Sequence, residues 1–131
     1  MVIIETAIFT RTIKQLMNDD EYRALQEVLV NRPDSGALIK NSGGLRKIRW
    51  KLEGRGKSGG IRVIYYWMVS DEHIYMLYGY PKNKQENLTQ QQLSMLKSIV
   101  RLNNQFRITN VCEISITPAI HKILYANFIA I

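Results

Sequence analysis

The sequence predicts a single α+β domain of order β-α-α-β-β-β-α, in which an antiparallel meander sheet carries helices packed on one face, followed by a C-terminal extension. Two patterns predict it. Apolar residues recur at helical spacing near both ends of the domain, and three strand-like segments with short links lie between them. With 131 residues and a hydrophobic fraction of 46%, the chain is large enough to bury one core.

The first part of the chain predicts one strand and two helices. The β-branched run at residues 2–5 is typical of a strand, at the edge or in the centre of a sheet. From Phe9 the apolar residues recur at helical spacing to about Asn18. A second amphipathic helix follows, with Asp19 as its expected N-cap and Pro33 at its end.

The middle of the chain predicts the meander. A loop rich in Gly, Ser and Asn at 34–44 precedes three segments whose alternation or β-branched and aromatic content is typical of strands, namely residues 45–52, 61–69 and 73–80. A third helix capped by Thr89 is expected after Pro81. Residues 105–131 do not continue this pattern, so we expect a domain at 1–104 and an extension of unknown role at 105–131.

The cysteine count and the hydropathy exclude several classes of protein. Cys112 is the single cysteine, which excludes an internal disulfide and a zinc site built on cysteines, and fits a reducing compartment. The sequence has no run of roughly 18 apolar residues such as a membrane helix needs. We therefore expect a cytoplasmic protein that does not associate with membranes.

The positive charge is concentrated in one segment. Between Lys40 and Arg62 the chain has eight basic residues and one acidic residue, a local charge of +7 that equals the formal charge of the whole chain. The remaining residues are balanced, with ten basic and ten acidic groups. Such a local field suits a polyanionic partner, whereas the alternative is a solvated loop that keeps the protein soluble.

The spacing of the cations favours a nucleic-acid backbone. Lys47, Arg49 and Lys51 alternate along one expected strand, about 6.5 to 7 Å apart, which resembles the spacing of phosphates on an extended strand. Arg62 begins the next strand and Lys82 follows the last, so the meander is expected to bring all five together. The alternative is that these residues form an ordinary solvent-exposed face.

Aromatic side chains are dense in the last two expected strands, and unstacked RNA bases can dock on such rings. Packing in the core is the alternative for about half of them. Tyr66 and Tyr80 are the pair we expect to be exposed.

Other site chemistries have little support. His73 and His121 are far apart in the sequence, and no spacing of potential ligands indicates a metal, so no cofactor is expected. The stretch GRGKSGG contains Gly-Lys-Ser, but a strand follows it instead of the helix that a phosphate-binding loop requires.

The expected element order resembles the RelE/HigB ribonuclease toxins of type II toxin–antitoxin systems, and is most similar to the HigB-like branch. Two stretches carry the resemblance, GGLRKIRWKLEGRGKSGGIRVIYYW and YGYPKNKQENLT, and it spans about residues 1–104. It implies a RelE-like fold and a ribosome-dependent endonuclease, an mRNA interferase, that cuts messenger RNA. It also implies a cognate antitoxin and, through the complex with that antitoxin, operator DNA as a further partner.

The resemblance also implies roles for individual residues. Four cations match the basic positions of the family and are the expected catalytic residues, with Lys47 as proton acceptor, Arg49 orienting the phosphate, and Arg62 and Lys82 stabilising charge in the transition state. The remaining expected RNA-binding residues are Arg46, Lys51, Arg55, Lys57, Tyr66, Tyr80 and Lys84. Leu88 stands where some relatives carry a tyrosine. Two alternatives remain, a non-catalytic nucleic-acid-binding module and an inactivated toxin that acts as a transcriptional co-regulator.

Overall fold

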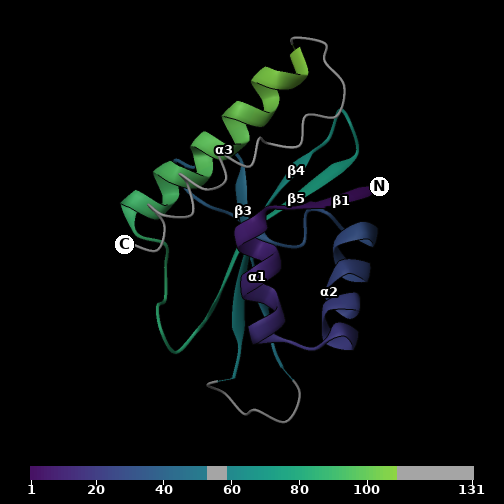
Figure 1. Cartoon of the computed structure of the whole chain (residues 1–131), viewed down its shortest axis with the longest axis vertical. Coiled ribbons are helices and arrows are strands. Elements are labelled where there is room, and N and C mark those ends of the chain that lie inside the picture. The colour runs from purple at the N-terminus through teal and green to yellow at the C-terminus, as the bar shows by residue number, and fades with distance from the viewer. Residues whose placement is uncertain (53–58, 109–131) are drawn as a thin grey trace. The chain divides into compact units, whose positions relative to one another are not determined.

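The computed structural model describes residues 1–52 and 59–108. Its elements are, in chain order, β1 (Val2–Glu5), α1 (Ala7–Leu16), α2 (Asp19–Asn31), β2 (Ala37–Leu38), β3 (Leu45–Trp50), β4 (Ile61–Met68), β5 (His73–Pro81) and α3 (Gln90–Ile108). This confirms the expected α+β class, and the three segments predicted as a meander are β3, β4 and β5 (Figure 1). The residue contacts divide the chain into two compact units, Met1–Asn87 and Leu88–Ile131.

The five strands form one sheet in the order β1-β5-β4-β3-β2. The β3–β4 and β4–β5 pairs are antiparallel, as expected of a meander. Strand β1 lies at one edge and pairs in parallel with β5. Strand β2 forms the other edge and was not predicted, because its two residues lie in a segment rich in turn-forming residues.

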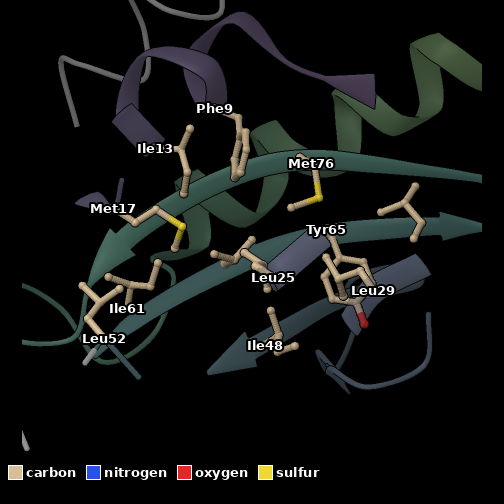
Figure 2. Close-up of a cluster of buried hydrophobic side chains, with 12 residues drawn as sticks. Phe9, Ile13, Met17, Leu25, Leu29, Ile48, Leu52, Ile61, Tyr65 and Met76 are labelled. Carbon is tan, nitrogen blue, oxygen red and sulfur yellow. The ribbon is translucent and has the colours of Figure 1, made fainter. Parts of the chain in front are cut away.

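The core of the first unit lies between the sheet and the helices α1 and α2. Phe9, Ile13 and Met17 from the first helical segment and Leu25 and Leu29 from α2 pack against buried side chains of the sheet (Figure 2). The strand residues in this cluster include Ile48, Ile61, Val63, Tyr65, Ile74 and Met76. This cluster occupies one face of the sheet, whereas Leu45 and Ile64, which are also fully buried, lie on the opposite face.

Side-chain caps fix where two of the helices begin. Asn18, and not the predicted Asp19, caps α2: its Oδ1 accepts from the N–H of Glu21 at 2.8 Å, and the Glu21 carboxylate accepts from the N–H of Asn18 at 3.1 Å. This reciprocal capping box places Asp19 in the first turn. Thr89 caps α3 as predicted, since its hydroxyl accepts from the N–H of Gln92 at 3.1 Å. None of the described helices is long and apolar enough to cross a bilayer.

Candidate nucleic-acid interface

The strand register places three cations in two neighbouring rows across the sheet. In the first row Arg49 of β3 pairs with Arg62 of β4, which pairs with Tyr80 of β5. In the second row Lys47 pairs with Ile64, two residues along the same strands. Because side chains alternate between the two faces of a strand, Lys47, Arg49 and Arg62 all lie on the face opposite the core residues Ile48, Ile61 and Val63.

An irregularity in β5 brings two tyrosines to the same face. Met76 pairs with Tyr65 and faces the core, whereas Tyr78 pairs with Ile64, so Leu77 is an extra residue relative to β4. This β-bulge reverses the alternation and places Tyr78 and Tyr80 beside the cations. Gly79 between them faces α1, since a Cβ built there would lie 3.5 Å from Leu16 Cδ1.

Arg62 is a buried charge with little compensation. Its side chain is 6% exposed, and its Nη2 lies 3.9 Å from Oε1 of Glu86, a carboxylate that is itself 63% exposed. Its buried Nε has no hydrogen-bond partner among the described residues. Burying a guanidinium costs free energy unless it is well paired, so folding alone gives little reason for an arginine here.

Lys47 lies beside these arginines and has one defined polar contact. Its Nζ donates to Oδ1 of Asn87 at 2.9 Å. Partial desolvation lowers the pKa of Lys47 below its ordinary value of 10.5, and the positive charges of Arg49 and Arg62 lower it further, while Glu86 acts in the opposite direction. Lys47 is thus more easily deprotonated than a solvated lysine, as a proton acceptor must be.

Tyr80 is buried, and the prediction that it is exposed is wrong. The side chain is 2% accessible, and its hydroxyl donates to the backbone oxygen of Glu86 at 3.4 Å. Burial raises the pKa of Tyr80 to about 12, although the charge of Arg62 lowers it. The ring is therefore a buried neighbour of Arg62 in the first row and offers no surface on which a base could stack.

Tyr66 is half-buried on the face that carries Lys47, at the far end of β3 from Arg49. It pairs with Leu45, one row beyond Lys47, and its ring centroid lies 6.5 Å from that of Tyr75. Part of its ring therefore remains accessible, which is compatible with the predicted contact to RNA but does not test it.

Arg46 lies apart from the other expected RNA-binding residues. It alternates with Lys47 and is on the opposite side of β3, where Nη1 donates to the backbone oxygens of Gly36 at 2.8 Å and Asp34 at 3.3 Å. These bonds tie β3 to the loop before β2. In the described part of the protein, Arg46 therefore stabilises the edge of the sheet.

The remaining predicted residues lie around the rows or outside the described structure. Lys51 follows β3 and is exposed, as are Lys82 and Lys84 after β5. The backbone N–H of Lys82 donates to the oxygen of Gly60 at 2.9 Å, which holds its Cα two residues beyond the Arg62 row. Arg55 and Lys57 lie outside the described residues.

Sequence reasoning did not identify Glu86 and Asn87, which supply oxygens to Arg62 and Lys47. Both lie in an irregular segment after β5, and Asn87 is 40 residues from Lys47. No spacing rule relates residues so far apart, so only the register of the sheet and the path of the following segment reveal these contacts. In residues 1–52 and 59–108, no group of three or more His, Cys, Asp or Glu side chains is placed to hold a metal ion.

Residues 1–121 match the family model described as the RelE toxin of the RelE / RelB toxin–antitoxin system. The chain belongs to the RelE toxin family. The matched range includes both rows of the interface and extends beyond residue 104, where the resemblance seen in the sequence ended.

Membership of the RelE family shows which kind of system this chain comes from. It is a toxin of a toxin–antitoxin system, and the family implies a cognate antitoxin as its partner. Toxins of this family are typically endoribonucleases.

Proposed function

We propose that this chain is an mRNA interferase of the HigB-like branch. It would act in the cytoplasm on messenger RNA that is being translated on the ribosome, and its cognate antitoxin would neutralise it. The observation that carries the proposal is the convergence of Lys47, Arg49 and Arg62 on adjacent positions of one sheet face, with Arg62 buried and poorly compensated. An anionic ligand would supply the compensation that the described residues lack.

The proposed reaction uses the ribose of the RNA as nucleophile. Lys47 in its neutral form takes the proton of the 2′-hydroxyl, and the resulting oxygen attacks the adjacent phosphorus. The bond from phosphorus to the 5′ oxygen then breaks, and that oxygen takes up a proton. The products are a 2′,3′-cyclic phosphate and a 5′-hydroxyl. The reaction needs little more than alignment, proton transfer and charge stabilisation, all of which side chains can provide.

The proposed roles of the cations follow from their places in the sheet. Arg62 binds the non-bridging phosphate oxygens, because a guanidinium matches them with two parallel hydrogen bonds and the burial of this side chain holds it rigidly. Arg49, its exposed cross-strand neighbour, orients the phosphate as it arrives. Lys82 adds positive charge from the segment after β5.

Contacts farther from the reacting phosphate would hold the RNA strand. We assign these to the exposed Lys51 and Lys84, to Arg55 and Lys57, and to the half-buried ring of Tyr66. Arg46 and Tyr80 are reassigned to structural support, because the first binds backbone oxygens on the other face and the second is a buried member of the first row.

Induced expression tests the proposal. The unaltered chain should arrest growth, and mapped transcripts should show new 5′ ends within translated regions. Lys47→Met should abolish both effects, while Lys14→Met, which removes an exposed lysine from α1, should behave like the unaltered chain. A harmless chain that still binds RNA would contradict the proposal and favour a non-catalytic module.

A further inference from the structure

The segment after β5 holds the side chain most directly in contact with Lys47. Asn87 Oδ1 accepts from Lys47 Nζ at 2.9 Å, and the backbone oxygen of Asn87 accepts from Gln85 Nε2 at 3.0 Å. The two contacts fix both the backbone and the amide of Asn87. Lys47 therefore meets a defined acceptor, although its long side chain could otherwise adopt many rotamers.

The chemistry of this acceptor suits a lysine that must lose its proton. An amide oxygen fixes the direction of one N–H bond but carries no formal charge, so it stabilises the ammonium form less than a carboxylate would. The neighbouring Glu86, which is charged, lies against Arg62 instead. The charged acceptor is thus paired with the arginine that stays protonated, and the neutral acceptor with the lysine that must titrate.

The direction of the hydrogen bond matters as well. The carbonyl oxygen of an amide can only accept, so Lys47 must direct an N–H toward Asn87 in both of its protonation states. In the neutral amine the lone pair is then left to point away from Asn87. The contact therefore limits the lone pair to the two other staggered positions on Nζ, which favours abstraction of a ribose proton from the side away from Asn87.

We propose that Asn87 is a positioning residue that orients the amine of Lys47 toward the 2′-hydroxyl of the RNA. This inference rests on the function proposed above and adds a residue to it. The charged groups around Lys47 are Arg49 on β3, Arg62 on β4 and Glu86 in the segment after β5, so a charge introduced at position 87 would join this set.

Asn87→Asp gives the sharpest test, because it keeps the shape of the side chain and adds one negative charge. The pKa of Lys47 should rise, and the rising limb of the pH–rate profile should move to higher pH by the same amount. If the limb moves by about one pH unit, the rate at a fixed pH on that limb falls about tenfold, while the plateau at high pH stays nearly unchanged. Glu86→Gln should move the limb the opposite way, and Asn87→Ala should lower the plateau.

Two readouts separate this inference from the proposed function. The titration of Lys47, followed by NMR of the labelled side chain in the free protein, measures the contact without any cleavage. Single-turnover cleavage of mRNA on programmed ribosomes measures its use. Asn31→Asp is the matched control, because it adds the same charge at the exposed end of α2, and it should change neither readout.

The outcomes are distinct. A Lys47 titration that Asn87→Asp leaves in place would overturn the inference, and the proposed function would stand. A titration that moves while the pH–rate profile does not would show that Lys47 is not the proton acceptor, which overturns the positioning role together with the proposed mechanism. Parallel movement of both, without movement in the Asn31→Asp control, supports the inference.

Discussion

Replacing Arg62 by methionine should lower the rate of cleavage roughly 10²- to 10³-fold without weakening the fold. The contact with Glu86 joins a side chain that is 6% exposed to one that is 63% exposed, at 3.9 Å. Ion pairs with such an exposed partner contribute at most about 1 kcal/mol. Replacing a buried ion pair by apolar side chains of similar volume is often neutral, or stabilising by about 1 to 4 kcal/mol, and here the remaining partner, Glu86, is already exposed to water. We therefore expect the change in the free energy of unfolding of Arg62→Met to lie between a loss of about 1 kcal/mol and a gain of about 4 kcal/mol.

Activity should change in the opposite direction. Loss of one preorganised contact to the charge of a transition state typically costs roughly 10²- to 10³-fold in rate. Urea unfolding, followed by the fluorescence of Trp50 and Trp67, which pack against the core, gives the stability. Single-turnover cleavage on ribosomes gives the rate.

The control is the same substitution on the other face of the sheet. Arg46→Met removes two hydrogen bonds to backbone oxygens, so it should destabilise the protein by about 1 to 3 kcal/mol and leave the intrinsic cleavage rate nearly unchanged. If Arg62→Met instead destabilised the protein by more than about 1 kcal/mol and cleaved normally, Arg62 would be a structural residue and our reasoning about its burial would be wrong.

Three further predictions concern the fold and its pH dependence. Tyr65→Phe should lower the free energy of unfolding by about 1 to 3 kcal/mol in urea titrations, because the hydroxyl accepts from the buried N–H of Gly36 at 2.8 Å and donates to the backbone oxygen of Pro33. The control is Tyr66→Phe, which should change the free energy of unfolding little, because the Tyr66 hydroxyl makes no hydrogen bond in the described part of the chain. Asn18→Ala should cost about 1 kcal/mol in the same measurement by removing the cap of α2, and an unchanged value would mean that the capping box does not form in solution. Burial raises the pKa of Tyr80 from 10.0 to about 12, so the stability that this hydroxyl contributes is complete below pH 10 and is lost as the pH rises toward 12. The free energy of unfolding should therefore fall less between pH 10 and 12 in Tyr80→Phe than in the unaltered chain. Identical pH profiles of the two proteins would refute the burial of the hydroxyl.

The elements whose pattern is local could be predicted from the sequence. The alternation of residues 45–52 identified β3 and put Lys47 and Arg49 on one face, because side-chain direction in a strand depends only on position. Thr89 was identified as the cap of α3 because capping also depends on local sequence, namely a threonine just before an amphipathic run. The prediction of Asp19 as the N-cap of α2 was wrong, because Asn18 is an equally good cap and forms the reciprocal bond with Glu21.

Features that depend on pairing between distant segments could not be predicted. The bulge at Leu77 reverses the alternation of β5, and it alone turns Tyr80 toward Arg62 instead of toward α1. The contacts of Glu86 and Asn87 likewise depend on the path of an irregular segment. Sequence reasoning thus predicted the alternation that puts Lys47 and Arg49 on one face, and missed the contacts that Glu86 and Asn87 make there.

The nature of the nucleophile is the most direct test of the account. Once the scissile position has been mapped, an mRNA that carries a single 2′-deoxynucleotide on the 5′ side of that bond can be placed on ribosomes with the purified chain. We predict that this message is not cut there, and that the all-ribose message yields a 2′,3′-cyclic phosphate and a 5′-hydroxyl. Cleavage of the deoxy-substituted message at the normal rate would contradict attack by the 2′-hydroxyl, and with it the role of Lys47 as proton acceptor.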